Sequence, residues 1–424
     1  LAVRRVSTSL DAIVARAVDP DPGSRYQSVP ELAADLRRFQ NGESIRVRRK
    51  MTRRAWFAAT ALPLVGGGVF FALRGDPPAE VTPAQMVRLQ SSGHPAHIAL
   101  SPDGTRALAV FRTNGRAILF DPRDGEELGS VPGPPYGIGF GNFDEGGGRF
   151  LLGHSNGSFR FYSCDDAHPV SPAVVCASGG DWVVNIRHLT LDGSDDAAVL
   201  TLVGKSLKAW TEEGRELWSL PLVGSPYRFA VSPDRTTALV GSPKGRLNFI
   251  DLTTATKRLL TRNSAHIYEI KYSPDGSSFA CASYDHTACV WDSAGEFQWQ
   301  LKHGGEVKDL DFSPDGKLLA TPSFDGAVRV WDLANGEEVN RFHHLAEVLS
   351  VCFTPDGRYL ASGGRDDQLR VWDMVSGKAA VEPIDCAGGV DRIRFAKRKD
   401  GSLNALVQTW SSELLVIPLP ELGR

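Results

Sequence analysis

The sequence predicts an all-β fold, a β-propeller in which short four-stranded sheets stand radially, over residues 85–424. The main observation is a phrase that returns about every 41 residues from residue 97 onward, which is the length of one propeller blade. Its clearest copies are IKYSPDGSSFACASYDHTACVWD, LDFSPDGKLLATPSFDGAVRVWD and VCFTPDGRYLASGGRDDQLRVWD. The length of 424 residues agrees, because propellers are among the few folds that grow past about 300 residues as one unit.

Each copy of the phrase reads as a series of strands and turns. Strand a ends in an aromatic residue, and Ser/Thr-Pro-Asp-Gly then makes a hairpin turn in which Pro sets φ and Gly accepts a positive φ. Strand b is small and apolar, a turn with Asp follows, and strand c ends in Trp-Asp. A second turn, such as residues 332–336, leads into strand d.

Counting the apolar anchor of strand a predicts eight blades. The anchors are Ile98, Ile138, Ile186, Phe229, Ile270, Leu310, Val351 and Ile393. The last unit holds only three strands before the chain ends, so we expect residues 85–90 (QMVRLQ) to supply its outer strand and close the ring. Seven blades, with one divergent unit misread, is the alternative.

The repeats resemble those of the WD40 family over roughly 330 residues. Intact Trp-Asp pairs stand at Trp291-Asp292, Trp331-Asp332 and Trp372-Asp373. The resemblance implies a structural tetrad of His, Ser, Asp and Trp, which is complete once, as His303, Ser323, Asp325 and Trp331. The neighbouring units have Asn263 in place of the His and Gly364 in place of the Ser. Because the set recurs from blade to blade, we interpret it as structural rather than catalytic.

The resemblance also implies where a protein or peptide partner would bind. In WD40 proteins, the first variable position after the leading apolar residue of strand a faces the channel mouth on the top surface. The partner-binding candidates at or near that position are Tyr136, Trp182, Tyr227, Tyr268 and Lys308. Leu349 and Asp391 occupy it in the remaining units. Aromatic residues are enriched at interface hot spots, although these side chains could equally plug the channel or pack between blades.

Residues 1–45 read as two helices that resemble the last helices of bacterial eukaryotic-type Ser/Thr protein kinases. The matching stretch is LDAIVARAVDPDPGSRYQSVPELAADLRRFQNG. Arg25 corresponds to the arginine that pairs with the glutamate closing that family's activation segment. The glycine-rich loop, catalytic lysine, H-R-D and D-F-G are absent from the sequence, so we expect no catalysis by this chain and a kinase domain upstream.

A basic segment, residues 46–54, precedes 19 uncharged residues, 55–73, which are long enough for a single membrane span. The excess of Lys and Arg before the span places the N-terminal side in the cytoplasm and the propeller outside it, after a linker at 74–84. Arg53-Arg54 also allows a twin-arginine export signal, which would be cleaved. A cytoplasmic propeller follows if 55–73 does not span.

Composition and charge limit the classes of partner, cofactor and activity that we expect. The net charge is −3, divided into +6 for residues 1–54 and −9 for 55–424, which argues against nucleic acid as a partner. We expect the scattered cysteines to be small apolar fillers: Cys164, Cys176, Cys281, Cys289, Cys352 and Cys386. No metal or cofactor is expected. The enzymatic alternative, a pyrroloquinoline-quinone dehydrogenase, needs acidic residues on the channel axis, where only Asp391 is foreseen. The sequence thus predicts an interaction, sensor or scaffold module.

Overall fold

The computed structural model describes residues 87–90, 95–111, 115–134, 137–177, 181–190, 197–411, 413–419 and 422. All of them belong to the second of the chain's two units, Pro77–Arg424. The predicted kinase-like helices with Arg25, the basic segment, the apolar segment 55–73 and the linker therefore lie outside the described residues, as does Tyr136. Within the described part of the chain there is no helix with the length and apolar character that a membrane crossing requires.

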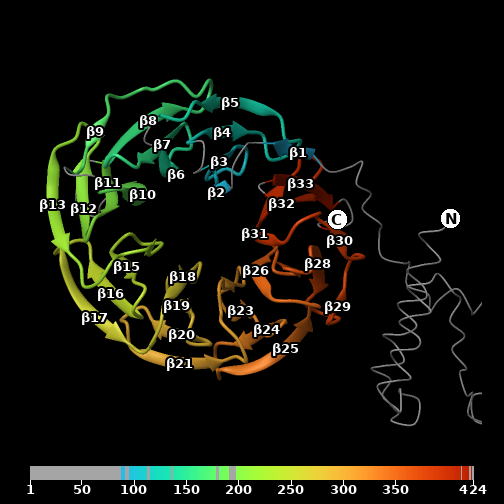
Figure 1. Ribbon diagram of the computed structural model, residues 1–424. Coiled ribbons are helices and arrows are strands. Elements are labelled where there is room, and N and C mark those ends of the chain that lie inside the picture. The colour runs from blue at the N-terminus through green and yellow to red at the C-terminus, as the bar shows by residue number, and fades with distance from the viewer. Residues whose placement is uncertain are drawn as a thin grey trace, which may run out of the picture. The chain divides into compact units, whose positions relative to one another are not determined.

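The described strands form eight antiparallel sheets around a central channel (Figure 1). Each sheet is a blade of four strands, and in the first seven blades the strands follow chain order from the channel outward. The seventh blade carries one extra short strand. The eight-bladed prediction is confirmed over the seven-bladed alternative.

The strands of the first four blades, from the inside outward, are as follows. The first is β2 (Pro95–Leu100), β3 (Ala107–Phe111), β4 (Ala117–Phe120) and β5 (Glu127–Val131), and the second is β6 (Ile138–Phe143), β7 (Arg149–His154), β8 (Ser158–Ser163) and β9 (Val174–Val175). The third is β10 (Val183–Thr190), β11 (Ala197–Val203), β12 (Ser206–Thr211) and β13 (Glu216–Pro221), and the fourth is β14 (Arg228–Val231), β15 (Thr237–Gly241), β16 (Arg246–Asp251) and β17 (Thr256–Thr261).

The strands of the other four blades follow in the same order. The fifth is β18 (Ile267–Tyr272), β19 (Ser278–Ser283), β20 (Thr287–Asp292) and β21 (Phe297–Lys302), and the sixth is β22 (Asp311–Phe312), β23 (Leu318–Pro322), β24 (Ala327–Asp332) and β25 (Glu337–His343). The seventh is β26 (Val348–Phe353), β27 (Tyr359–Gly364), β28 (Gln368–Asp373) and β29 (Lys378–Ala379) with β30 (Ile384–Asp385), and the eighth is β31 (Val390–Lys397), β32 (Leu403–Thr409), β33 (Glu413–Leu419) and β1 (Val87–Gln90).

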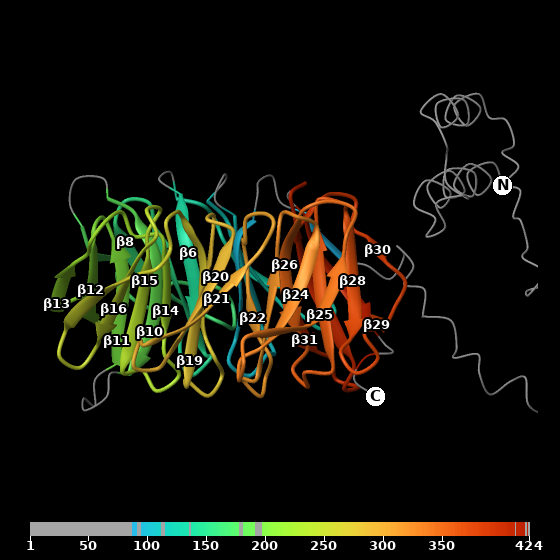
Figure 2. The same cartoon turned by 90° about the horizontal axis from the view of Figure 1, so that it is seen from below.

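The strands run along the channel, and their turns collect at its two ends (Figure 2). Because each blade is antiparallel, the turns between its first and second strands lie at one end. The turns between its second and third strands, and the loops between blades, lie at the other end. We call this second end the rim. Side chains at the start of each innermost strand therefore stand next to the rim.

The predicted Ser/Thr-Pro-Asp-Gly turns have the geometry that their residues favour. In the sixth blade, the Ser313 hydroxyl donates to the Asp315 carboxylate at 2.6 Å, and Gly316 takes a φ of +71° while its N–H donates to the Ser313 carbonyl at 2.9 Å. The fourth blade has Arg235 at the glycine position, with a φ of +64°. The same short hydrogen bonds from Ser to Asp hold that turn in place, so this arginine adopts a conformation that usually favours glycine.

The apolar core is divided into layers between neighbouring blades. One layer joins the facing surfaces of the fourth and fifth blades, where Leu239 and Ile270 are buried and Phe279 stacks on Trp291 with 5.4 Å between ring centroids. A corresponding layer joins the eighth blade to the first. The faces of each blade are thus buried only because a neighbour stands on both sides.

The ring is closed by the earliest described strand, as the sequence predicts. Strand β1 pairs antiparallel with β33, the third strand of the last blade, with Val87 opposite Val416 and Gln90 opposite Glu413. The outermost strand of the eighth blade therefore comes from a segment that precedes the first blade. Without it, β33 would present an open edge to solvent.

This closure predicts a difference between two truncated chains. A chain that begins at residue 91 lacks the β1–β33 hydrogen bonds, so we expect it to be less stable than one that begins at residue 85 by on the order of 3 kcal/mol. We also expect it to self-associate through the exposed edge of β33. Denaturant unfolding and light scattering measure the two effects. Equal stability and a monomeric state for both chains would contradict this account of closure.

Candidate partner-binding site

The hydroxyl group of the structural tetrad in the sixth blade belongs to Thr321, not to Ser323. The indole Nε1 of Trp331 donates to Thr321 Oγ1 at 2.8 Å, and His303 Nε2 lies 2.8 Å from the same oxygen. Trp331 pairs with Leu319, and its ring reaches two residues further along β23, which is Thr321. Ser323 instead accepts a hydrogen bond from the Asp325 N–H at 3.3 Å and donates to a loop carbonyl.

The complete tetrad is in the seventh blade, where the sequence count finds a glycine in place of the serine. His344 Nδ1 lies 3.0 Å from the Asp366 carboxylate, and its Nε2 lies 2.7 Å from Ser362 Oγ. Trp372 donates to that same hydroxyl at 2.8 Å. Gly364 has another reason to be glycine, since an added Cβ would lie 2.0 Å from the carbonyl oxygen of Glu347.

Related links occur in other blades. Trp210 donates to Thr201 at 2.8 Å in the third blade. In the fifth blade, Cys281 holds the hydroxyl position and its thiol donates to the side-chain oxygen of Asn263 at 3.0 Å. Burial lowers the pKa of His303 to about 4, so this imidazole is neutral near pH 7. The network ties the loop between blades to the strands beneath it.

The register of the second blade places Gly139 at the rim position that the sequence assigned to Tyr136. Pairing places Gly141 opposite Leu152, so Gly141, and not Ile138, is the equivalent of the strand-a anchors. Ile138 corresponds instead to Ile267 of the fifth blade, since both precede a β-bulge and stand three residues before the anchor. The rim position of this blade is therefore Gly139, where an added Cβ would lie 2.5 Å from the carbonyl oxygen of Val183 and no aromatic side chain fits.

The other predicted rim residues differ from one another in position and burial. Trp182 is 53% exposed but stands two residues before the position, which Val184 holds. Leu349 is buried. Tyr227 and Tyr268 occupy the rim position on adjacent blades and are both half-buried.

Tyr227 and Tyr268 belong to a continuous group of rings that we call the aromatic arc: Tyr227, His266, Tyr268 and Tyr284. The ring of His266 meets Tyr227 edge-on at 5.1 Å between centroids and stacks on Tyr268 at 4.9 Å. Tyr268 in turn stacks on Tyr284 at 5.5 Å. Tyr284 is 46% exposed, so the arc ends at the protein surface. Burial raises the pKa of Tyr268 to about 12, so its phenol stays neutral.

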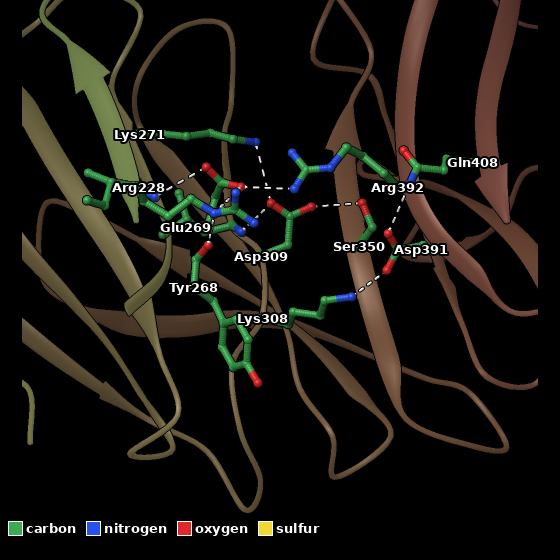
Figure 3. Close-up of polar contacts among 12 residues, drawn as sticks. Arg228, Tyr268, Glu269, Lys271, Lys308, Asp309, Ser350, Asp391, Arg392 and Gln408 are labelled. Atoms are coloured by element: carbon green, nitrogen blue, oxygen red, sulfur yellow. Dashed lines mark hydrogen bonds and ion pairs between the residues drawn. The ribbon is translucent and has the colours of Figure 1, made fainter. Parts of the chain in front are cut away.

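A second rim cluster continues around the next blades and consists of Lys308, Phe324, Arg365, Asp391 and Trp410. The guanidinium carbon of Arg365 lies 5.8 Å from the Phe324 ring centroid and 5.4 Å from that of Trp410. The amine of Lys308 lies 5.2 Å from the Trp410 ring and also pairs with the Asp391 carboxylate (Figure 3). Cations over aromatic faces are attracted by the ring quadrupole, which holds these side chains in place at the rim.

Five of these rim residues were not foreseen from the sequence: His266, Tyr284, Phe324, Arg365 and Trp410. A sequence signal exists for the last four. Tyr284, Phe324 and Arg365 each come directly before the turn Asp of successive blades, and Trp410 holds the corresponding turn in the eighth blade. In the fifth to eighth blades, the turn between strands b and c therefore presents one large side chain at the rim. A comparison restricted to strand a could not find this second row.

Below the rim, the channel wall carries a network of charges that the sequence count also missed (Figure 3). Glu269 lies 3.2 Å from Arg392 and 3.9 Å from Arg228. Lys271 lies 2.9 Å from Asp311 and 3.7 Å from Asp309. These residues stand directly before and after the strand-a anchors, so the channel holds carboxylates in addition to the foreseen Asp391.

Two of these carboxylates are held in their ionised form by the channel's own cations. Burial opposes ionisation, but the Lys271 ammonium and the Arg392 guanidinium hold the pKa of Asp309 at about 2. Asp309 also accepts a hydrogen bond from the Ser350 hydroxyl at 2.7 Å. The pKa of Glu269 is lowered by Arg392 and Arg228 against the same effect of burial.

The described residues include six cysteines but no cluster of candidate metal ligands. Among the described residues, no group of three or more His, Cys, Asp and Glu side chains is placed to hold a metal ion. All six cysteines are free and buried, as predicted. Burial raises the pKa of Cys164, Cys176 and Cys352 to about 12, so these thiols are protonated near pH 7.

Comparisons with known proteins agree with this architecture. Residues 257–292, 295–332 and 336–373 match the family model described as "WD domain, G-beta repeat". These spans hold the three Trp-Asp pairs, so the chain carries WD40 repeats. The crystal structure of the computationally designed Ika8 protein is similar in fold, with a TM-score of 0.61, 17% identity, and coverage of 77% of this chain and 98% of that chain.

One curated relative matches a short stretch. Actin-interacting protein 1-2 of Arabidopsis thaliana is 38% identical over 66 residues, which is 15% of this chain. The match spans only 11% of the length of that relative. It is therefore evidence for the repeat and is too short to carry over a whole protein's partner.

The corrected tetrad predicts which hydroxyl stabilises the sixth blade. Thr321→Val keeps the side-chain shape but leaves Trp331 Nε1 and His303 Nε2 without their partner, so we expect a loss of about 1–3 kcal/mol in the free energy of unfolding. Thr321→Ser retains the hydroxyl and is the control. Denaturant titration measures both. A loss in Ser323→Ala with none in Thr321→Val would return the tetrad hydroxyl to Ser323.

Proposed function

We propose that this chain, an eight-bladed propeller with WD40 repeats, is a protein-interaction module that holds a protein or peptide partner on its rim. The observation that carries the proposal is the aromatic arc. Its four rings are in contact one after another, one pair edge-on and two pairs stacked, and the row reaches solvent at Tyr284. Aromatic side chains that are partly exposed and already fixed in place are the residues that most often dominate binding energy at interfaces.

The rest of the rim supports the same proposal. The arc is fixed before binding, because Arg228 lies 4.6 Å from the Tyr227 ring and is itself held by Glu269 and the Tyr268 carbonyl. A rigid aromatic surface loses little conformational entropy when a partner binds. The second rim cluster extends this surface with Trp410, which is 47% exposed, and with the cation of Arg365.

The relative named for actin does not identify the partner. Its 66 matched residues are less than two repeats of about 41 residues. The interaction surface proposed here depends on the rim side chains of the fourth to eighth blades together, and such a surface differs among propellers that share one fold.

We propose further that the chain is the non-catalytic, C-terminal part of a membrane-anchored Ser/Thr protein kinase. The support comes from the sequence: the kinase-like stretch at 1–45, the basic segment 46–54, and the uncharged segment 55–73. In this arrangement the propeller lies outside the cytoplasm and acts as a sensor or scaffold, with the kinase domain inside. The recurrence of related buried hydrogen bonds in several blades also favours a role in structure over one in catalysis.

The arc can be tested through partner capture. With residues 80–424 as bait, Tyr227→Ala combined with Tyr268→Ala should weaken partner binding by about 30-fold or more, as expected for hot-spot side chains. Val339→Ala is the matched control, because Val339 is an exposed apolar residue on the outer strand β25. Binding by the double variant that equals that of the control, with an unchanged melting temperature, would show that the arc is not the site.

The membrane arrangement has a separate test. Reporter enzymes that are active only inside or only outside the cytoplasm are fused after residue 80 in a bacterial host. We expect the external reporter to be active and to lose its activity when residues 55–73 are deleted. Activity of the internal reporter in the undeleted chain would instead support a cytoplasmic scaffold.

A further inference from the structure

The central channel contains a cavity of about 560 Å³ below the rim. It is lined by side chains from the innermost strands of seven blades, and Pro233 and Pro274 place it toward the end opposite the rim. Its size falls within the range of small-molecule sites, which is about 300–1,000 Å³. The cavity is distinct from the aromatic arc, whose members do not line it.

The charges around this cavity do not balance. Six cations line it: Arg187, Arg228, Arg235, Lys271, Arg392 and Arg394. Four carboxylates oppose them: Glu145, which pairs with Arg235, and Glu269, Asp309 and Asp311. The local charge is therefore about +2, in a chain whose net charge is −3. The excess lies on the wall of the channel, where Arg187 and Arg394 are both half-buried.

Arg187 and Arg394 carry this excess. Glu269 pairs with Arg228 and Arg392, and Lys271 pairs with both aspartates. Within the described part of the chain, no carboxylate lies at ion-pair distance from Arg187 or Arg394, although both line the cavity. The hydrogen bond of the Arg394 guanidinium is to the carbonyl of Ile393, at 2.8 Å.

Burial and the nearby arginines lower the pKa values of two groups that line the cavity. Burial, and then the nearby Arg394, lower the pKa of Arg187 to about 10. His97, which lines the same cavity, has its pKa lowered well below 6.5 by burial and by four arginines of the channel. An unpaired cation in such surroundings destabilises a fold unless an anion neutralises it.

We infer that Arg187 and Arg394 form a binding site in the channel for the phosphoryl or carboxylate group of a small molecule. Guanidinium groups donate two parallel hydrogen bonds to such oxyanions, and two of them together supply the charge that one doubly charged anion neutralises. The remaining volume of the cavity accommodates the body of the ligand. The site goes beyond the proposed function, because the arc binds at the rim and does not depend on it.

Inorganic phosphate and citrate are the probes that test this site in the intact chain. At constant ionic strength, with chloride as the reference salt, phosphate or citrate should raise the melting temperature and give a saturable binding isotherm by calorimetry. A response to phosphate identifies a phosphoryl site, and a response to citrate identifies a carboxylate site. No response to either anion beyond that of chloride overturns the inference.

Variants separate the channel site from general salt effects. Arg187→Gln and Arg394→Gln should each weaken anion binding by about 30-fold or more. Arg341→Gln should not, because Arg341 lies on the outer strand β25 and pairs there with Glu338. Since Arg187 has no carboxylate partner, Arg187→Gln should also leave the melting temperature of the free protein unchanged or higher. Anion binding by both channel variants at the strength of Arg341→Gln overturns the inference.

Discussion

The pairing of β1 with β33 is the interaction on which the rest of the structure depends. A blade of this chain has an apolar surface on both faces, and each face is buried only by the adjacent blade. In an open row, the first and last blades would each leave a whole face in water. The four-residue strand β1 joins the two ends of the row, so that the layer between the eighth and first blades forms like any other. Everything at the rim and in the channel requires this closed ring.

Within the closed ring, polar groups have three separate roles according to their depth. Buried hydroxyls and indoles, as in Ser362 and Trp372, fix the loops to the strands. Aromatic rings at the rim are fixed but partly exposed, which suits them to contact another molecule. Charged groups in the channel neutralise one another except at Arg187 and Arg394. The inner strand of a blade supplies both rim and channel residues, as in Tyr268, Glu269 and Lys271, where the channel residues stand one and three positions after the rim residue.

The sequence was sufficient for the fold and for the closure because both depend on repeated, local patterns. The turn at Ser313–Gly316 and the Trp-Asp pairs recur at a constant spacing, so the blade count and the source of the missing strand could be predicted. The exact side-chain contacts could not be predicted in this way. Thr321 stands on β23 and Ser323 directly follows that strand, and only the pairing register shows which of the two the Trp331 indole reaches.

Several side chains at the rim and in the channel could not be placed from the sequence either. In the second blade, Ile138 is the equivalent of Ile267 and not of the anchor Ile270, so the prediction lay three residues early and the rim position is Gly139. The true anchor there is Gly141, which an apolar pattern does not mark. Tyr284 and Trp410 come from turns that the comparison along strand a did not include. Arg187 and Glu269 can be recognised in the sequence as charged residues. That they line the same cavity depends on how the innermost strands of seven blades are arranged around the channel.

The buried cysteines have a consequence for where such a propeller can work. A thiol with a pKa of about 12 is present as thiolate in only about one molecule in 10⁵ at pH 7. Disulfide exchange and peroxide oxidation proceed through the thiolate and need access to it. Here the thiols are protonated, and burial keeps other molecules away from them. The side chains that fill the blades would therefore stay reduced in an oxidising compartment as they do in a reducing one.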